Sequence, residues 1–583
     1  SIRISYIGDL ILLKDQVIAA KNKKTGKYEF DDMFKYTSKH FHESDLTIGV
    51  FEGPCAGNNT NYSTSNYADG LPLYLNYPDE FAEAVSKAGI NLVTNANNHL
   101  LDKGVKGAMR TMDILDKYNI SHVGGYRNKE EKDRVFIVDV KGIKIAVLAY
   151  TTIMNYYKID TLYEDYNYIT RVIPHLSSNY YDEIYEEMKN DFIKAKKMSP
   201  DIIMVLAHIG RQFVHYTVPI QEKWNEIFVE LGADIVLDDH SHAVQPLQFI
   251  RNSLIVNSPG NYVNSYIKHD GDSTSIINIY INKQTKKVIA ASAIPMYSTQ
   301  IRPKYFTSIP IYDLIKNKVI VLTNEKRKRV EEIQLMSTKV LVGKKYEINE
   351  IQKEYFFINK NYYDFNRNNT NYCDNLNKYY NKIIYKYIKN SNSITFIGDS
   401  ITKGTKNGYF PWYEPMINCF NKKKIINISR PSYTTKLILK DFKNKIMDSK
   451  SDLYIIALGT NDIRYRNKGI CSMDPKEYIN KMNQIVNLAK NKNSKFIFVA
   501  PWFSFPDDTI SKINHKNKKI LMKKYSLELK KYSETNNYLF IDPNEYLEKI
   551  ISKNREKYMI DYIHPNNQDG IELYSESVFI NSK

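Results

Sequence analysis

Short hydrophobic runs of strand length recur through the first part of the chain, and amphipathic segments separate several of them. The runs occupy residues 2–7, 46–51, 90–94, 143–149, 202–207, 235–237 and 254–257. Hydrophobic positions at helical spacing fill residues 78–88 and 107–118. Strands that alternate with helices in this way predict an α/β fold for this part of the chain.

A second series of hydrophobic runs begins near residue 394. Its members occupy residues 394–397, 425–428, 453–458, 496–500 and 539–541, with long Lys-rich helical segments between them. This spacing is typical of a doubly wound parallel sheet. Residues 301–391 alternate little, so we interpret them as a connector that packs on both halves. The sequence therefore predicts domains at 1–300 and 392–583, joined by 301–391, and the chain has no internal repeat.

Composition agrees with a globular protein that has more than one core. The chain has 583 residues, several times the usual domain length of roughly 100–200 residues. Its net charge is +17, and we interpret the Lys and Arg runs mainly as solvated surface. A basic balance also attracts polyanions such as acidic polysaccharides, nucleotide-activated sugars or anionic lipid headgroups. No nucleic-acid motif accompanies the charge, so we expect no nucleic-acid partner.

The cysteines and the hydrophobic pattern are evidence about the cellular location of the protein. Four cysteines, Cys55, Cys373, Cys419 and Cys471, lie far apart without a CxxC pair, so we expect buried free thiols. No run approaches 18 apolar residues, and the first residues form a predicted strand. These features favour a cytoplasmic or membrane-peripheral location. Because the chain does not begin with Met, an extracytoplasmic location after removal of a leader is the alternative.

Three polar motifs follow strands of the second half. Ser400 stands in IGDSITKG directly after a strand, where a side chain can project from the carboxyl edge of the sheet. Asn461, in LGTND, follows another strand, and its amide can donate a hydrogen bond to an oxyanion. Asp561 precedes His564 by three residues in DYIHP, so the carboxylate can orient the imidazole. A Gly-Asp-Ser turn alone is more often structural, but the three motifs together predict a nucleophile with its proton relay.

These motifs resemble the SGNH (GDSL-like) hydrolase family in type and order. The resemblance implies a three-layer αβα sandwich with a parallel sheet and a Ser400, His564 and Asp561 triad that needs no cofactor. It further implies an oxyanion site made by the Ser400 amide, the Asn461 side chain and a second-block amide. Ser432 stands there in place of the usual Gly, which makes the turn less permissive and favours reduced activity or acyl transfer. Trp412 matches a family aromatic, and a core role for it is equally compatible.

Polar residues also follow the strands of the first half. They are Asp9, Glu52, Asn98, His99, His208, His240 and His242. A lone His after a strand is usually structural, whereas paired His residues at one strand end reach a metal more readily. Two carboxylates, an amide and four imidazoles fit the donors of a dinuclear Zn, Mn or Fe site. Such a site would activate water and hold an anionic oxygen, as in phosphoester hydrolysis.

Six ordered motifs of the first half resemble the CapA family of poly-γ-glutamate capsule-synthesis proteins, relatives of calcineurin-like metallophosphatases. They are YIGD, FEGP, NNHLLDKG, HIGRQ, HSHAVQP and SPGNY. The resemblance implies a metallophosphatase-like αββα sandwich.

By the same resemblance, the candidate ligands of a divalent metal are Asp9, Glu52, Asn98, His208, His240 and His242, and His99 is the candidate acid or phosphate contact.

The first half departs from the metallophosphatase pattern at two places. The segment after Asp9 lacks the His of a D-x-H motif, and Asp239 replaces the Gly of GHxH, so we expect one bound ion or none. Arg211 and Gln212 replace an acidic and aromatic pair, and Arg211 would suit an anionic substrate.

We interpret the whole chain as a bifunctional bacterial enzyme of capsule or surface-polysaccharide metabolism. It would combine an O-acyl esterase or acyltransferase with a metal-dependent, phosphatase-like hydrolase, acting on a surface glycan or its activated precursor. One alternative keeps the esterase but makes the first half an inactive glycan-binding module. Another makes the chain a transport or assembly factor for a surface polymer. The residues do not predict the acyl group, the polymer or the oligomeric state.

Overall fold

The structure is a computed structural model, and it describes residues 1–173, 180–364, 369–464, 466–467, 470–471, 474–511 and 513–583. The chain folds as two compact units, Ser1–Asn359 and Lys360–Lys583. The segment 301–391, which we expected to be a connector, divides between them. Strands β13 (Tyr305–Pro310) and β14 (Tyr355–Ile358) join a sheet of the first unit, whereas helix α11 (Ile383–Asn390) packs in the core of the second.

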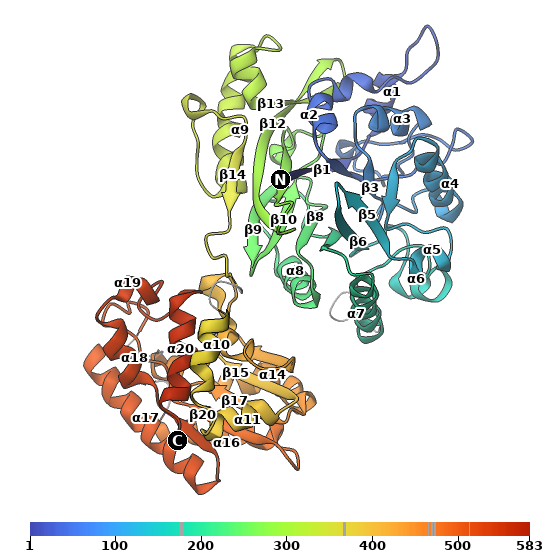
Figure 1. Ribbon diagram of the computed structural model, residues 1–583. Coiled ribbons are helices and arrows are strands. Elements are labelled where there is room, and N and C mark those ends of the chain that lie inside the picture. The colour runs from blue at the N-terminus through green and yellow to red at the C-terminus, as the bar shows by residue number, and fades with distance from the viewer. Residues whose placement is uncertain (174–179, 365–368, 465, 468–469, 472–473, 512) are drawn as a thin grey trace. The chain divides into compact units, whose positions relative to one another are not determined.

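The first unit contains two mixed sheets (Figure 1). The larger sheet has the order β13-β12-β11-β1-β2-β3-β4, and β14 pairs with β12. Strands β1 to β4 run parallel, whereas β11 to β13 are antiparallel. Their remaining bounds are β1 Ile2–Leu10, β2 Leu46–Phe51, β3 Leu92–Thr94, β4 Ser121–Val123, β11 Ser273–Ile281 and β12 Val288–Arg302.

The smaller sheet of the first unit has the order β5-β6-β7-β8-β10-β9. Its strands are β5 Phe136–Val140, β6 Ile143–Thr151, β7 Ile202–His208, β8 Ile235–Asp239, β9 Val244–Ile250 and β10 Ser253–Pro259. The central strands are parallel, and β7 is buried along its whole length, as its continuous hydrophobic sequence predicts. All the strands predicted in residues 1–280 are present, so the α/β prediction for this half is confirmed.

Helices cover the outer faces of the two sheets, which pack on each other. Ile48 and Val50 of the larger sheet share one core with Met204 and Leu206 of the smaller sheet. Helices α1 (Lys14–Ala20), α2 (Ser38–Glu43), α3 (Asp79–Lys87) and α4 (Gly104–Lys117) bury residues against the larger sheet, while α7 (Tyr181–Lys197) and α8 (Pro219–Leu231) bury residues on the side of the smaller one. The arrangement is the predicted αββα sandwich.

Three shorter or peripheral helices complete the first unit. They are α5 Lys129–Asp133, α6 Ile159–Asp165 and α9 Asn324–Val342. Thr323 caps α9 by accepting a hydrogen bond from the amide of Lys326, and Leu341 of α9 reaches the core between the sheets. This helix belongs to the segment that we expected to be a connector.

The second unit is a three-layer αβα sandwich around a five-stranded parallel sheet, as predicted. The order is β16-β15-β17-β20-β21, with bounds β15 Ser393–Gly398, β16 Lys424–Ser429, β17 Leu453–Ala457, β20 Lys495–Val499 and β21 Leu539–Ile541. Helices α14 (Thr435–Ser449), α16 (Pro475–Ala489) and α17 (His515–Thr535) pack on one face. On the other face lie α10 (Asn369–Asn377), α11, α13 (Glu414–Ile417), α18 (Asn544–Ile551) and α20 (Asp569–Ile580). Short elements near the sheet edge are α12 (Ser400–Lys403), α15 (Thr460–Arg464), α19 (Arg555–Tyr558), β18 (Arg466–Asn467) and β19 (Ile470–Cys471).

Two cysteines correct the expectation of free thiols. Cys373 and Cys419 form a disulfide with a Cα–Cα distance of 5.2 Å, although 46 residues separate them in the chain. The fold brings α10 and the end of α13 together, which no local spacing reveals. Cys55 is a buried free thiol, as expected, and the side chain of Cys471 lies outside the described residues.

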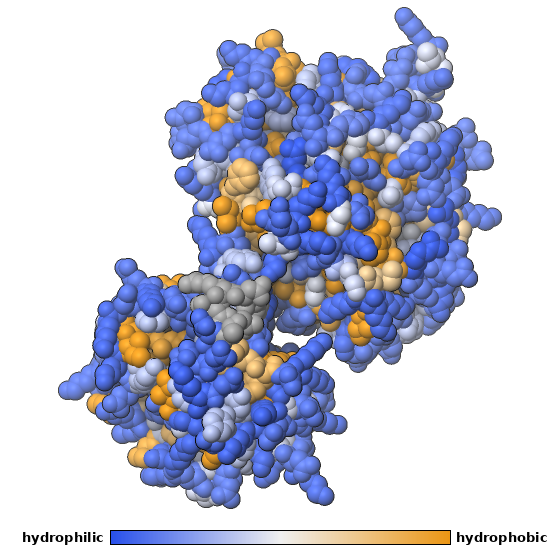
Figure 2. Space-filling view, viewed as in Figure 1, coloured by the Kyte–Doolittle hydropathy of each residue, from blue (hydrophilic) through white to orange (hydrophobic). Residues whose placement is uncertain are grey.

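The molecular surface is mainly polar on the face drawn in Figure 2, where hydrophobic residues form small separate patches on each unit. Within the described residues, no helix has the length and apolar character needed to cross a membrane.

Candidate active sites

Ser400 lies at the amino end of α12, directly after β15. Gly398 permits this tight turn, because a Cβ atom at that position would come within 2.1 Å of the Thr402 hydroxyl oxygen. Asp399 caps the short helix by accepting a hydrogen bond of 3.0 Å from the Ile401 amide. The Ser400 Oγ lies 2.9 Å from Nε2 of His564, which is close enough for direct proton transfer.

Asp561 holds the other side of the His564 ring. Its Oδ2 lies 2.8 Å from His564 Nδ1, and its Oδ1 accepts hydrogen bonds from the backbone amides of Ile563 and His564. Burial alone would raise the pKa of Asp561, but the hydrogen bonds from His564 lower it to about 2. The carboxylate is therefore ionised near neutral pH and fixes the tautomer in which Nε2 faces Ser400.

Asn461 follows β17, the strand next to β15, so it lies at the same sheet edge as Ser400. Gly398 pairs with Ala457 at the ends of these two strands. The Asn461 Nδ2 donates to the Tyr433 carbonyl at 3.0 Å, and its Oδ1 accepts from Arg464 Nη1 at 3.0 Å. Arg464 was not among the predicted site residues, because no sequence motif indicates its contact with Asn461.

The remaining predicted residues of this half differ in environment. Ser432 follows β16, whose Ser429 pairs with Gly398, so its loop starts at the same sheet edge. Its φ of 66° lies in the left-handed region that favours glycine, and its side chain is exposed. Trp412 is fully buried and donates from Nε1 to the Thr402 hydroxyl at 3.2 Å. The structure thus places Trp412 in the core.

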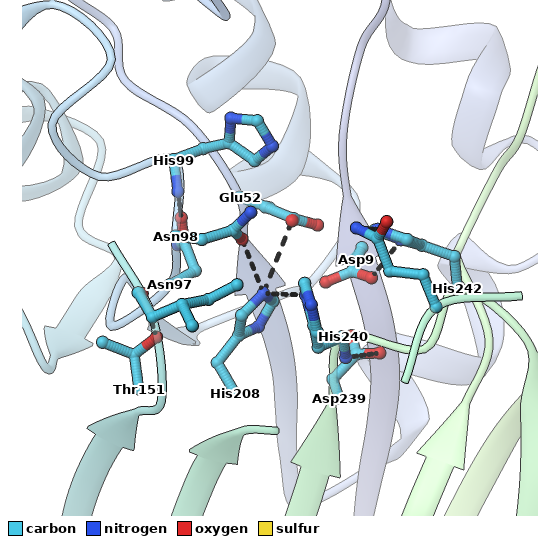
Figure 3. A network of polar contacts seen from close by, with 12 residues as sticks. Asp9, Glu52, Asn97, Asn98, His99, Thr151, His208, Asp239, His240 and His242 are labelled. Atoms are coloured by element: carbon cyan, nitrogen blue, oxygen red, sulfur yellow. Dashed lines mark hydrogen bonds and ion pairs between the residues drawn. The ribbon is translucent and has the colours of Figure 1, made fainter. Parts of the chain in front are cut away.

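The first unit brings its predicted metal-ligand candidates together where strands of both sheets end (Figure 3). Two groups of side chains each offer donor atoms within 4.8 Å of one another. One comprises Glu52, His208 and His240, and the other comprises Asp9, Glu52 and His242. Glu52 belongs to both groups, so the donors could hold two neighbouring ions, more than the one ion or none that we expected from the sequence.

Short contacts connect this cluster in the structure. His208 Nε2 lies 2.9 Å from Asn98 Oδ1, 3.0 Å from His240 Nδ1 and 3.5 Å from Glu52 Oε1. His242 Nδ1 lies 2.9 Å from Asp9 Oδ2. All six predicted ligand candidates therefore occupy one buried cluster.

The electrostatics of the cluster fit a divalent cation. Both carboxylate oxygens of Glu52 are buried, and neither has a hydrogen bond within the described residues. Burial and the neighbouring Glu52 carboxylate raise the pKa of Asp9, whereas burial lowers the pKa of His208 and of His240. Burial alone would lower the pKa of His242 too, but the Glu52 and Asp9 carboxylates raise it to about 10, so metal binding there would release a proton. Buried carboxylates without donors are costly, while neutral imidazoles are the form that binds metal. The donor set and its unpaired oxygens suit Mn, Zn or Fe.

His99 lies beside the cluster and belongs to a buried pair. Its Nδ1 is 2.7 Å from Asp102 Oδ2, and its amide donates to Asn97 Oδ1 at 2.9 Å. Burial opposes protonation of His99, but the hydrogen bond with Asp102 raises its pKa overall. The role of His99 as an acid or phosphate contact stays a prediction. Asp102 appeared in the sequence only as a motif residue.

Asp239 is a third buried carboxylate, beside those of Asp9 and Glu52. From the sequence we interpreted it as a departure from the family pattern and not as a site residue. Its Oδ1 accepts from the His240 amide at 2.9 Å, and its Oδ2 has no hydrogen bond within the described residues. His240 and His242 both have positive φ angles, 134° and 57°. Such strained backbone is common at functional sites. At the other departure, Leu10 and Ile11 are buried core residues.

A pocket of about 620 Å³ opens above this cluster. Asn98, His99 and His240 line it, so a molecule in the pocket could reach His99 and two of the candidate metal ligands. Arg211 and Gln212, the pair singled out in the sequence, also line this pocket.

The fold and the two clusters thus define a two-sheet, metallophosphatase-like unit and a parallel-sheet unit with a Ser–His–Asp arrangement. Comparisons with known proteins agree with this division. Residues 3–266 match the family described as "Bacterial capsule synthesis protein PGA_cap", and residues 396–568 match the "GDSL-like Lipase/Acylhydrolase family".

Two curated relatives resemble the first unit. The chain is 26% identical over 238 residues to "Capsule biosynthesis protein CapA" of Bacillus anthracis and 25% identical over 260 residues to "PGA biosynthesis protein CapA" of Bacillus subtilis. These matches cover 41% and 44% of this chain, and 54% and 62% of the relatives. The chain therefore spans less than two thirds of the length of either relative.

Solved structures resemble the second unit. An α/β hydrolase, LAE5, from the metagenome of Lake Arreo is 18% identical, with a TM-score of 0.27 over 33% of this chain and 94% of that one. The acetylxylan esterase Axe2 of Geobacillus stearothermophilus is 17% identical, with a TM-score of 0.27 over 33% and 95%. A G-D-S-L family protein of Veillonella parvula is 19% identical, with a TM-score of 0.26 over 32% and 94%.

The chain thus carries a region similar to the CapA capsule-synthesis proteins, followed by a region similar to the GDSL-like lipase/acylhydrolase family. Both resemblances predicted from the motifs are confirmed.

Proposed function

We propose that the chain is a bifunctional enzyme of bacterial capsule or surface-polysaccharide biosynthesis or modification. Its second unit would be a Ser–His–Asp O-acyl esterase or acyltransferase that acts on a surface glycan or its activated precursor. The observation that carries this proposal is the continuous relay from Ser400 through His564 to Asp561, with contacts of 2.9 and 2.8 Å.

The chemistry of this relay follows from its geometry. His564 Nε2 takes the Ser400 hydroxyl proton while Oγ forms a bond to the ester carbonyl carbon. When the C–O bond to the leaving alcohol breaks, His564 returns the proton to the alkoxide. The acyl group remains on Ser400 until water, or an acceptor hydroxyl, attacks the carbonyl and releases it as an acid or a new ester.

Stabilisation of the oxyanion would come from three donors at the same sheet edge. They are the Ser400 amide, the Asn461 side-chain amide and the Ser432 amide, which replaces a family glycine amide. The choice between hydrolysis and transfer depends on whether water or a sugar hydroxyl reaches the acyl-enzyme.

We assign a metal-dependent, phosphatase-like hydrolase role to the first unit. Glu52, His208, His240 and Asn98 would hold one ion, and Asp9, Glu52 and His242 would hold a second. When bound, such ions supply Lewis acidity toward the oxygen atoms of a phosphoester. In its protonated form, His99 would donate from Nδ1 to Asp102 and from Nε2 to a substrate oxygen, and the raised pKa of its imidazole favours that form.

A second candidate for the first unit is a catalytically inactive glycan-binding module. Two observations favour it: Leu10 and Ile11 stand where the metallophosphatase motif has a His, and Asp239 replaces a glycine. Elemental analysis of the purified full-length chain separates the candidates. Bound Mn, Zn or Fe that is lost in His240→Ala, and kept in the surface variant His42→Ala, supports the hydrolase, whereas a metal-free native protein supports the binding module.

The disulfide bears on where the enzyme works. Disulfides persist mainly in oxidising compartments, so the Cys373–Cys419 bond favours an extracytoplasmic location over a cytoplasmic or membrane-peripheral one. At the cell surface the esterase would meet an assembled glycan.

The esterase proposal is tested by screening acetylated glycans and nucleotide sugars for acetate release. Native protein and Ser400→Ala should differ on the true substrate, and Ser552→Ala, which alters an exposed helix-end serine, is the matched control. Equal acetate release by native protein and Ser400→Ala would exclude the Ser400 mechanism.

A further inference from the structure

The pocket above the buried carboxylates and histidines has a chemically mixed wall. Tyr67, Tyr156 and Phe213 provide aromatic surface, and Arg211 provides a cation. Asn155 and Gln212 add amide groups to the lining. Pockets of this type bind small molecules through an apolar face and a few placed polar groups.

The aromatic part of the wall is held in place by its surroundings. Tyr156 is half exposed, at 50%, and stacks on Tyr74 with ring centroids 4.3 Å apart. Phe213 packs edge-on against Tyr67 at 5.7 Å, and its amide donates to the Ser241 carbonyl at 2.7 Å. Tyr156 and Phe213 have φ angles of 67° and 62°, and this backbone conformation costs roughly 1–2 kcal/mol for a non-glycine residue. Backbone strain of this kind also occurs at ligand-binding residues of other proteins.

Arg211 supplies the positive charge of the pocket lining. Arg211 is exposed, lines the pocket and forms no ion pair with any residue that the structure describes. A guanidinium binds phosphate or carboxylate through two parallel hydrogen bonds. Arg211 is therefore available to an anionic group of a bound molecule.

We propose that this pocket binds a sugar ring that carries a phosphate or carboxylate group. The ring would lie against Tyr156 and Phe213, Asn155 and Gln212 would bind its hydroxyl groups, and the anion would meet Arg211. This inference names the substrate class of the first unit and rests on the function proposed for its buried cluster.

Calorimetric titration of the full-length chain tests the inference with glucose 1-phosphate, glucuronate, inorganic phosphate and triglutamate. We expect glucose 1-phosphate to bind about tenfold more tightly than inorganic phosphate. Tyr156→Ala or Phe213→Ala should remove this preference without weakening phosphate, whereas Arg211→Gln should weaken both ligands. Tyr216→Ala is the matched control, because Tyr216 is 56% exposed and outside the pocket lining.

The outcomes separate this inference from the proposed activity. Binding that persists in a metal-free, inactive protein would contradict the hydrolase but support the sugar site. A preference for the sugar ligand that survives both aromatic variants, or tighter binding of triglutamate, would overturn the inference. Comparison of glucose 1-phosphate with glucuronate tells which anion the site prefers.

An independent observation concerns the second unit, where Arg464 holds the candidate oxyanion donor. Its Nη1 donates to Asn461 Oδ1 at 3.0 Å, while Nε and Nη2 contact the two carboxylate oxygens of Asp508 at 2.6 and 2.8 Å. Lys518 Nζ and the Ser504 hydroxyl also contact Asp508 Oδ2. The side chains of Arg464 and Asp508 are only 6% and 0% exposed. A buried guanidinium that is held by hydrogen bonds from all three of its nitrogen atoms has little freedom to reorient.

We infer that Arg464 is a positioning residue for oxyanion stabilisation. Its bond to Oδ1 sets the direction of the Asn461 amide, so that Nδ2 faces the sheet edge. One Nδ2 hydrogen is donated to the Tyr433 carbonyl, and the other remains for the oxyanion. The charged donor also polarises the amide and strengthens this second hydrogen bond. The inference rests on the proposed esterase activity.

A double-mutant cycle tests this role with p-nitrophenyl acetate as the substrate. Arg464→Gln should lower kcat about tenfold with little change in KM, and should weaken binding of a boronate transition-state analogue by a similar factor. In a protein that already carries Asn461→Ala, Arg464→Gln should have little further effect on kcat. The double variant should therefore be no slower than Asn461→Ala alone. Arg464→Lys gives a second variant that keeps the buried charge and loses the directed bond.

If the effects of Arg464→Gln and Asn461→Ala on kcat multiply fully in the double variant, Arg464 has only a structural role. A change in KM alone in Arg464→Gln would lead to the same conclusion. An inactive native protein would instead count against the proposed esterase. Thermal unfolding of each variant identifies loss of fold.

Discussion

The Nε2 atom of His564 lies 2.9 Å from the Ser400 Oγ, although 164 residues separate the two in the chain. Asp561 contacts Nδ1 of the same imidazole, and this contact leaves Nε2 as the proton acceptor for Ser400. This pair would create a nucleophile at the edge of the parallel sheet.

The first prediction concerns Asp561. Its pKa of about 2 lies below the ordinary carboxyl value, so the stability gained from its ionised form is present above pH 4 and is lost only as pH falls toward 2. Asp561 therefore adds no pH dependence to stability or activity between pH 5 and 8. Asp561→Asn should lower kcat by about 10²- to 10⁴-fold across that range, because the imidazole loses its orientation and charge partner. A pH–rate profile of both proteins on p-nitrophenyl acetate measures this, and retention of full kcat would remove Asp561 from the relay.

The second prediction concerns the strained turn at Ser432. A glycine there would relieve the left-handed φ of 66°, so Ser432→Gly should stabilise the second unit by about 1 kcal/mol in urea unfolding. Ser552→Gly is the control, because Ser552 has a right-handed φ of −61° and should lose a few tenths of a kcal/mol or more. Destabilisation by Ser432→Gly would mean that its hydroxyl makes an important contact.

The third prediction concerns metal stoichiometry. Because Glu52 belongs to both donor groups, Glu52→Gln should abolish binding of both ions. His242→Ala touches one group only and should leave one ion, as should His208→Ala. Elemental analysis after equilibrium dialysis measures the ratios. Equal losses in all three variants would argue against two separate ions.

The fourth prediction concerns the Cys373–Cys419 disulfide. After titration of the denatured protein with a thiol reagent, peptide mapping should find Cys55 modified and Cys373 and Cys419 unmodified. Closure of a loop of 46 residues should contribute about 3–4 kcal/mol, so Cys373→Ser should lower the urea midpoint of the second unit. Four titratable thiols in protein prepared without reductant would contradict the bond and the compartment that it favours.

Much of the fold was predictable because its parallel strands are buried on both faces and appear as continuous hydrophobic runs. The antiparallel strands β11 and β12 were harder to predict, since buried polar residues such as Ser275, Asn278 and Ser292 interrupt their hydrophobic sequence. The segment 301–391 divides between the two units for a related reason: β14 depends on pairing with β12, a contact distant in sequence.

The site residues divide in a similar way. Those that follow predicted strands, such as Ser400 and His208, were found because parallel strands end at one edge. Arg464 and Asp239 gained their positions from contacts that cross between elements, with Asp508 and with the buried carboxylate cluster, and no sequence spacing reports such contacts. The Cys373–Cys419 pair was missed for the same reason.

The mass of the acyl-enzyme shows directly whether Ser400 is the nucleophile. Native protein mixed briefly with p-nitrophenyl acetate and quenched in acid should carry one acetyl group on the peptide that contains Ser400, and Ser400→Ala should carry none. An acetyl group found on another residue, or no acylation while native turnover continues, would contradict the assignment of Ser400 as the nucleophile.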